Sequence, residues 1–272
     1  MPETARKKPA DRHFSSWLSR NTIELMRSSL LGIFLVVAGL GTALSQNGST
    51  WHLWQGEKKL IVVTTPDWSA VQGTLTRYER SAAGWQAVGD TIPVVVGRAG
   101  LGWDPALVRA HPERYPGPVK HEGDGRSPAG IFELNHNIFG FAPALPSPRM
   151  YIPLTPTTEC VDDPKSRYYA QIVDRAQVDQ VDWKSSEKMR SVPQYRWGVV
   201  VNYNMDHPVR GDGSCVFLHQ WSAPSSGTAG CTAMAAENIE QIVRWVDGND
   251  QAVLVQLPKT GYERLRSHWQ LP

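Results

Sequence analysis

The sequence predicts a mainly β fold, and three observations support this prediction. The 272-residue chain contains 23 glycines and 20 prolines, which interrupt helices and favour turns between short strands. Most of its apolar segments are short and rich in valine, threonine and aromatic side chains, as in strands. After residue 50, only one segment shows clear helical spacing of apolar residues. Because 41% of the residues are hydrophobic, the chain can bury a substantial core.

The first predicted elements form a β-meander. Leu60–Thr65 is an apolar strand, and Thr74–Arg80 alternates with a period of two. We expect two further short strands in Gly84–Gly97, on either side of a Gly-Asp turn. The stretch Leu101–Tyr151 is rich in glycine, proline and histidine, so we expect mostly loops there, with one strand at Gly130–Leu134.

The second half of the chain contains the strongest strand signals. Arg196–Asn204 and Ser214–Trp221 are dense in valine and aromatic residues, and we expect both strands inside the sheet. A helix follows Cys231 and ends near Gly248. Its apolar residues recur at helical spacing: Ile239, Ile242, Val243 and Val246. The segment Ala252–Leu257 then predicts a closing strand.

Residues 1–45 form a predicted leader, which precedes a single domain at residues 50–272. The apolar run Ser28–Ser45 follows a basic residue and ends in small residues, the layout of a secretory signal peptide. Translation from Met26 would make this signal peptide compact, with the mature chain beginning near Gln46. The alternative is an uncleaved membrane anchor, because the run is about as long as a bilayer-spanning helix. In either case we expect the domain to be exported to the periplasm or cell envelope.

The charge balance excludes nucleic acid as a partner. The formal net charge is +2, but the first 45 residues hold six basic and three acidic side chains, so the remainder carries about −1. Nucleic-acid binding requires a strongly basic surface, which this balance does not supply. We expect membrane contact only through an uncleaved leader.

The segment HQWSAPSSGTAGCTAM, His219–Met234, has little core-forming bulk but supplies the parts of a cysteine-nucleophile site. Such a site needs a base for the thiol, backbone N–H groups for the developing oxyanion, and space for a substrate carbonyl. His219 ends a predicted strand and is the candidate base for Cys231. Gly230 allows a ligand to approach the backbone closely, and the N–H groups of residues 230–232 are candidate oxyanion donors.

The same residues have two other interpretations. Cys231 could be a buried structural cysteine beside an ordinary surface histidine. A zinc ion could instead be held by His219, Cys231 and Cys215, but the paired ligand spacings typical of zinc sites are missing. The acidic residues also lack the loop spacing of a calcium site. We therefore predict no metal and no other cofactor.

Two motifs in the chain resemble those of the L,D-transpeptidase catalytic domain family, also called the YkuD-type domain. The first is GDGRSPAGIFEL, and its matching residues are Ser127, Pro128, Gly130 and Phe132. The second is FLHQWSAPSSGTAGCTAM, and its matching residues are His219, Thr228, Gly230 and Cys231. The segments 160–174 and 198–204 resemble an exported bacterial branch of the family. The resemblance extends over residues 58–257 and follows the family's motif order.

This resemblance implies a compact β-sandwich with a helix after the catalytic cysteine. It also implies that the cysteine attacks the carbonyl of an L-centred diamino acid in a peptidoglycan stem peptide and expels D-alanine. An amine or water then resolves the thioester. Cys231 would be the nucleophile and His219 its base, with Gly230 and Thr228 in the surrounding loop. Ser226 and Thr232 would contact the stem peptide, and no metal or nucleotide is implied.

The chain departs from the commonest family pattern at two positions near the cysteine. Ala229 stands where that pattern has a histidine, and Ala233 where it has an arginine. Because an arginine suits bidentate binding of a carboxylate, its loss indicates altered substrate binding. The chain could be a transpeptidase of different specificity, a hydrolase such as an L,D-carboxypeptidase, or a catalytically silent module that binds peptidoglycan. Arg126, beside the Ser-Pro motif, could supply the missing cation or be an ordinary loop arginine.

The two remaining cysteines are candidates for a disulfide. An exported chain is in an oxidising compartment, and the implied nucleophile Cys231 must stay free. We therefore expect Cys160 and Cys215 to be bonded to each other, with two unpaired thiols as the alternative.

Overall fold

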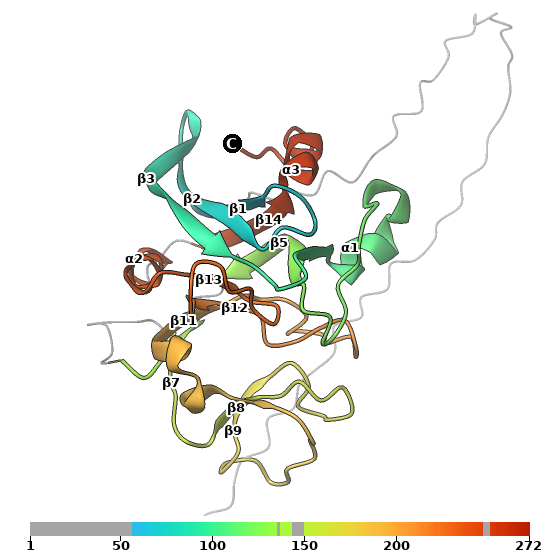
Figure 1. Cartoon of the computed structure of the whole chain (residues 1–272), viewed down its shortest axis with the longest axis vertical. Helices are drawn as coiled ribbons and strands as arrows, with labels where there is room; N and C mark the ends of the chain where they lie inside the picture. The colour runs from blue at the N-terminus through green and yellow to red at the C-terminus, as the bar shows by residue number, and fades with distance from the viewer. Residues whose placement is uncertain (1–55, 135–136, 143–149, 247–250) are drawn as a thin grey trace, which may run out of the picture. The chain divides into compact units, whose positions relative to one another are not determined.

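The computed structural model describes residues 56–134, 137–142, 150–246 and 251–272, and the fold over these residues is mainly β, as predicted (Figure 1). The strands are β1 Lys59–Thr65, β2 Gln72–Ser81, β3 Gly84–Val95, β4 Leu101–Trp103, β5 Ser127–Leu134, β6 Asn137–Gly140, β7 Met150–Pro153, β8 Thr158–Cys160, β9 Ile172–Asp174, β10 Glu187–Lys188, β11 Trp197–Val200, β12 Phe217–Gln220, β13 Thr232–Met234 and β14 Ala252–Pro258. The helices are α1 Pro105–Ala110, α2 Ala236–Val246 and α3 Lys259–Leu265, and the 3-10 helices are η1 Pro112–Arg114, η2 Met189–Ser191 and η3 Pro193–Arg196.

Eleven of these strands form one large sheet. Its order is β4-β5-β14-β1-β2-β3-β13-β12-β11-β6-β7, and a separate small sheet has the order β10-β8-β9. The predicted leader at residues 1–45, with its proposed start at Met26 and end near Gln46, lies outside the described residues. Within the described ranges, no helix combines the length and the hydrophobicity needed to cross a bilayer.

The strand β14 lies in the interior of the large sheet. It pairs in parallel with β1, where Val253 is opposite Leu60, and antiparallel with β5, where Leu254 is opposite Phe132. All seven residues of β14 are buried, as expected for a strand covered on both faces. The strands predicted at the two ends of the domain are therefore confirmed, and they are neighbours in the sheet.

The prediction of two strands in Gly84–Gly97 is wrong, because the single strand β3 runs through the expected turn. Gly89 has a φ of +70°, and the pairing with β2 shifts register between Leu75 and Arg77. This arrangement is a β-bulge, which accommodates extra residues in one strand while the pairing continues on both sides. A glycine with positive φ serves both a bulge and a tight turn, so the sequence alone did not separate them.

The stretch Leu101–Tyr151 holds more secondary structure than predicted. Strand β5 includes the expected Gly130–Leu134 and begins earlier, at Ser127. The helix α1 was not predicted, although Asp104 caps it by accepting from the N–H of Ala106 at 2.9 Å and a proline follows the cap. The strands β4, β6 and β7 were not predicted either, because three or four residues are too few to show a periodic pattern.

The elements around the candidate nucleophile agree with the prediction. Both β11 and β12 are interior strands, although they are shorter than expected. The helix α2 follows Cys231 and buries Ile239, Ile242, Val243 and Val246. Its predicted end at Gly248 is outside the described residues. The final helix α3, which begins directly after β14, was not predicted.

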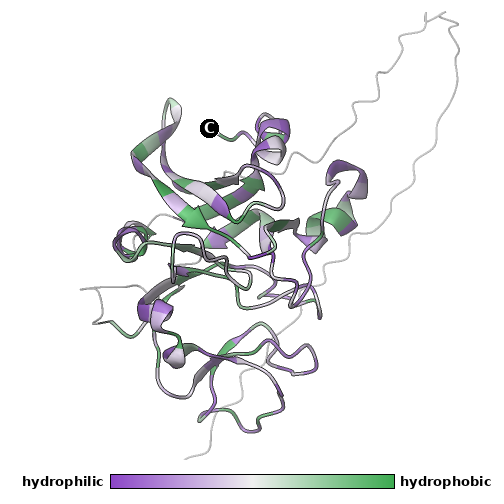
Figure 2. Ribbon diagram, viewed as in Figure 1, coloured by the Kyte–Doolittle hydropathy of each residue, from purple (hydrophilic) through white to green (hydrophobic). Residues whose placement is uncertain are grey.

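Two groups of buried side chains hold the domain together. The larger one packs the large sheet against α2, α3 and the C-terminal segment. Figure 2 shows hydrophobic and hydrophilic residues alternating along the β2–β3 hairpin. The smaller group contains Phe139, Cys160, Tyr195, Phe217 and Cys231, and so draws side chains from both sheets. The candidate nucleophile therefore lies where the small sheet meets the large one.

Candidate active site

Two neighbouring parallel strands position the candidate base and nucleophile. In the pairing of β12 with β13, His219 is opposite Ala233 and Leu218 is opposite Thr232. Cys231 directly precedes β13, so this register places it beside the start of β12. His219 is 8% exposed and Cys231 is 6% exposed, and both line one cavity.

The backbone of Cys231 is fixed by two hydroxyl groups. Its carbonyl oxygen accepts hydrogen bonds from Thr228 Oγ1 at 2.6 Å and from Ser127 Oγ at 2.8 Å. Ser127 in turn accepts from the N–H of Gly97 at 2.8 Å. The two motifs quoted from the sequence therefore meet at this carbonyl, which explains why residues about 100 positions apart belong to one site.

The loop before Cys231 uses one candidate oxyanion donor internally. The N–H of Gly230 donates to Thr228 Oγ1 at 3.1 Å. Thr228 thus accepts from one side of the loop and donates to the other, which makes it a positioning residue for the cysteine. With the Gly230 N–H engaged in this way, the N–H groups of Cys231 and Thr232 are the remaining candidates for an oxyanion.

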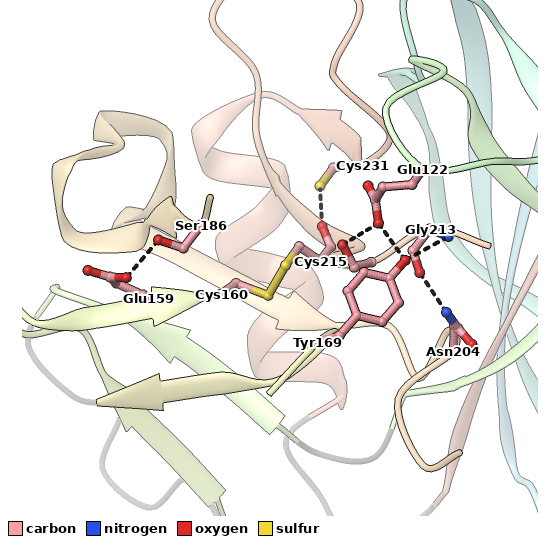
Figure 3. The surroundings of a disulfide bond; sticks show 10 residues. Glu122, Glu159, Cys160, Tyr169, Ser186, Asn204, Gly213, Cys215 and Cys231 are labelled. Atoms are coloured by element: carbon pink, nitrogen blue, oxygen red, sulfur yellow. Dashed lines mark hydrogen bonds between the residues drawn. A yellow bond between two sulfur atoms is a disulfide. The ribbon is translucent and has the colours of Figure 1, made fainter. Parts of the chain in front are cut away.

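The thiol of Cys231 is neutral at rest. Its Sγ donates to the carbonyl of Cys215 at 3.4 Å, as Figure 3 shows. Burial raises the pKa of Cys231 to about 12, and the nearby Glu187 carboxyl contributes in the same direction. Hydrogen bonds from the Phe217 N–H and the Tyr195 hydroxyl, together with the charge of Lys120, oppose this increase without cancelling it.

The imidazole of His219 is also neutral and has a defined tautomer. Its Nδ1 lies 2.6 Å from the carbonyl oxygen of Gln220. A carbonyl can only accept, so Nδ1 carries the proton and Nε2 keeps its lone pair as the basic atom. Burial lowers the pKa of His219 to about 4. The ring packs edge-on against Tyr195, with 5.1 Å between the ring centroids.

Two cavities meet at Cys231. The first has a volume of 220 Å³, and its lining includes Tyr195, His219, Trp221, Ser226 and Thr228. The second has a volume of 310 Å³, and its lining includes Arg98, Lys120, Glu122, Asp162 and Cys215. Three residues line both cavities: Glu187, Ala229 and Cys231. Cys231 therefore lies between the two cavities.

Two of the residues expected to bind substrate are engaged elsewhere. Arg126 donates through Nη1 to the carbonyls of Ala99 at 2.7 Å and Leu101 at 2.8 Å, so its guanidinium braces the backbone. Thr232 is 2% exposed, and its hydroxyl donates to Gln256 Oε1 at 2.6 Å. By contrast, Ser226 lines the first cavity.

The cations of the site come from residues that the sequence analysis did not select. Arg98 is exposed and lines the second cavity, whereas Lys120 is 3% exposed and lines the same cavity. The Nζ of Lys120 donates to Asp124 Oδ1 at 2.8 Å and to the carbonyl of His121 at 2.6 Å. The sequence signal available for Lys120 was its spacing of four from Asp124, which is common among surface pairs.

A disulfide joins the small sheet to the segment that contacts the thiol. Cys160 is bonded to Cys215, and Cys231 is free, as Figure 3 shows. With its sulfur bonded to Cys160, Cys215 is not available to the zinc site that the sequence left as an alternative. On β10, Glu187 pairs directly with Cys160, so the disulfide lies next to a residue that lines both cavities.

The arrangement of these groups is that of a candidate cysteine-nucleophile site in a mainly β domain. The chain belongs to the YkuD family, the L,D-transpeptidase catalytic domain, whose family model matches residues 60–255. Its fold is accordingly the YkuD-type β-sandwich with a helix after the candidate cysteine.

One solved structure with similarity to the chain is that of the helical cell shape determining protein Pgp2 from Campylobacter jejuni, in a mutant form. The sequence identity is 12% and the TM-score is 0.35. The similarity covers 74% of this chain and 47% of that chain, so the present chain spans less than half of the Pgp2 structure. A search of curated proteins found no match.

Proposed function

We propose that the protein is a cysteine-dependent acyltransferase of peptidoglycan stem peptides, with Cys231 as nucleophile and His219 as base. The observation that carries this proposal is that a free cysteine and a histidine with an unprotonated Nε2 line the same cavity. In a member of this family, that pair has the chemistry needed to form and resolve a thioester.

The first half of the reaction acylates the cysteine. Nε2 of His219 takes the thiol proton as Sγ of Cys231 attacks the carbonyl of the diamino acid. The C–S bond forms, the amide C–N bond breaks, and D-alanine leaves with the proton from the imidazolium. Because both groups are neutral at rest, proton transfer accompanies the attack instead of preceding it.

The second half of the reaction releases the acyl group. An amine or a water molecule attacks the thioester, His219 takes a proton from it, and the thiolate leaves and is protonated again. Attack by an amine gives transpeptidation, and attack by water gives L,D-carboxypeptidase or hydrolase activity. The cavity on the other side of Cys231 offers a route for this second reactant.

The cation for a substrate carboxylate is proposed to be Arg98. The family's arginine position is occupied by Ala233, which is fully buried in β13 between β3 and β12. Arg126 is committed to backbone carbonyls, and Lys120 is paired with Asp124. Arg98 is exposed at the second cavity, where its guanidinium can bind a carboxylate bidentately.

The leader and the disulfide support export as part of the same proposal. The apolar run after residue 27 has the layout of a secretory signal, and disulfides persist in oxidising compartments. We propose a location in the periplasm or cell envelope, where the substrate is found. Any membrane contact would come from retention of the leader.

A catalytically silent peptidoglycan-binding module is the second candidate. One observation favours it, namely the thiol pKa of about 12, which leaves little thiolate at neutral pH. This module would bind stem peptides in the same cavities but would form no thioester.

The test uses Cys231→Ser and His219→Ala in the purified protein, with a stem tetrapeptide that ends in a diamino acid and D-alanine. Cys231→Ser should abolish the thioester adduct and product, and His219→Ala should lower the rate by about two to four orders of magnitude, as loss of a general base does. A carbapenem should acylate Cys231 in the unaltered protein.

Intact-mass analysis and product masses give the readouts. Ser225→Ala is the matched control, since this serine is exposed in the same loop and should leave turnover unchanged. If the unaltered protein forms no adduct and no product while the tetrapeptide still binds, the silent module is the correct function.

A further inference from the structure

Glu187 lies at the candidate site but has no role in the proposed acylation step. It lies on β10 in the small sheet, is partly buried, and lines both cavities together with Cys231. Any group that approaches the sulfur from either side therefore passes this carboxyl. Its motif, SSEKM, has no pattern that would mark it from sequence.

Tyr195 lies close to both the carboxyl and the sulfur. It is 2% exposed, and the pKa of its hydroxyl is raised by burial and by the nearby Cys231 and Glu187. The same ring packs against His219. Burial raises the pKa of Glu187, and the nearby Asp162 adds to this effect, so the carboxylate is a better proton acceptor than an exposed one.

The second cavity contains one buried acceptor that has no donor among the described residues. Lys120 is paired with Asp124, and Glu122 accepts from Tyr169 at 2.6 Å and from Ser214 at 2.7 Å. Asp162, however, has a buried Oδ1 with no hydrogen-bond partner anywhere in the described part of the chain. A buried acceptor without a partner is costly, so a donor group brought into this cavity would be favoured beside Asp162.

These observations favour an ammonium group over the other charged parts of a stem peptide. Next to Glu187 and Asp162 a carboxylate such as that of D-alanine would be repelled, whereas Arg98, which lines the same cavity, is the cation assigned to a substrate carboxylate. The acceptor in the second step carries an amine, which is an ammonium ion in water at neutral pH. Two carboxyl groups beside the sulfur would attract this ion and orient its nitrogen.

We propose that Glu187 is a catalytic residue of the second half-reaction, in which its carboxylate binds the acceptor ammonium and takes one proton from it. Asp162 is the second acceptor for the same ammonium group. This inference rests on the proposed acyltransferase function and adds a reason for the chain to favour an amine over water.

The protons in this step balance. The ammonium gives one proton to Glu187, and the neutral amine then attacks the thioester carbonyl. As the C–N bond forms, the nitrogen gives its second proton to Nε2 of His219. The C–S bond breaks, the Cys231 thiolate takes the proton from the imidazolium, and Glu187 releases its own proton to solvent.

The experiment compares Glu187→Gln with Glu187→Asp and with Glu237→Gln, an exposed glutamate on α2 that serves as the control. The full-length protein is incubated with the stem tetrapeptide, and mass spectrometry measures the cross-linked dimer and the hydrolysed tripeptide. For Glu187→Gln, the ratio of dimer to tripeptide should fall by about 100-fold, within the usual range for general acid–base help. Glu187→Asp should recover part of the ratio, and Glu237→Gln should not change it.

Carbapenem acylation of Cys231 separates this proposal from the proposed function and checks that the variant folds. Its rate in Glu187→Gln should fall far less than the ratio of dimer to tripeptide does, because acylation involves no amine acceptor. An unchanged ratio, or acylation that falls as far as cross-linking does, would overturn the role of Glu187. If the unaltered protein acylates but only hydrolyses, the amine role fails while the nucleophile stands. Absence of acylation in the unaltered protein would instead refute the acyltransferase itself.

Discussion

At the scale of single residues, the resting site is a pair of neutral groups. Burial raises the pKa of the Cys231 thiol to about 12 and lowers that of His219 to about 4. The pair therefore differs from a thiolate–imidazolium site, which reacts with any small electrophile. A neutral pair limits the reactivity of the cysteine until a substrate carbonyl is positioned beside it.

The pKa of His219 also makes stability depend on pH. Between its ordinary value of 6.5 and about 4, the unfolded chain binds a proton at this residue and the folded chain does not. The free energy of unfolding should therefore fall as the pH decreases through this window, by up to about 3 kcal/mol for this one group. His219→Gln, which cannot titrate here, should lack this part of the loss.

Urea unfolding at pH 7.5 and pH 4.5 measures the difference. The unaltered protein should lose more stability than His219→Gln between the two pH values. Equal losses would mean that the histidine is solvated and charged in the folded state, contrary to its 8% exposure.

The candidate site residues that the sequence indicated lie mostly within one loop and the strand before it. Ser226, Thr228 and Cys231 are close along the chain, and His219 ends the strand before them. Glu187 comes from another sheet, and nothing in its neighbourhood along the chain indicates proximity to the cysteine. The position of Arg126 beside the Ser-Pro motif made it a plausible cation for the substrate. Its side chain instead donates to the carbonyls of Ala99 and Leu101, and the sequence does not show that these carbonyls lie nearby.

At the scale of elements, the small sheet is attached to the site by the disulfide. The Cys160–Cys215 bond closes a loop with a sequence separation of 55 residues. Replacing both cysteines by serine should lower the free energy of unfolding by about 4 kcal/mol in the chain-entropy treatment. Because Glu187 pairs with Cys160, we also expect cross-linking to fall more than carbapenem acylation in this double variant.

Non-reducing peptide mapping and urea unfolding test this expectation. Mapping should find one intramolecular bridge and a free Cys231 in the unaltered protein. A bridge that includes Cys231, or a double variant as stable as the unaltered protein, would contradict it.

The elements themselves were predictable where a long segment carries its own pattern. The strands β1 and β14 and the helix α2 are of this kind, since burial imposes a periodicity on seven to eleven residues. The bulge in β3 was predicted to be a turn, because the choice between a bulge and a turn at this glycine depends on the pairing of β3 with β2. The three-residue β4 exists only because β5 is there to pair with it.

At the scale of the whole domain, β14 joins segments that are distant in sequence. It lies between β1 and β5, so these two strands have no mutual pairing without it. Deleting residues 252–272 should therefore remove the cooperative thermal transition and the near-ultraviolet circular dichroism signal. Adding a synthetic peptide of residues 252–258 should restore part of both, whereas a deleted chain that still unfolds cooperatively would contradict this prediction.

The late position of β14 has a consequence for how the chain is made. A ribosome synthesises β1 about 190 residues before its parallel partner, and a sheet missing an interior strand cannot close its core. The nascent domain should therefore stay unfolded until synthesis has passed residue 258. A chain that crosses a membrane through a narrow channel must also be unfolded, and this strand order suits the export proposed above. On that route, folding would begin on the far side of the membrane, where the thiols of Cys160 and Cys215 would first meet an oxidant.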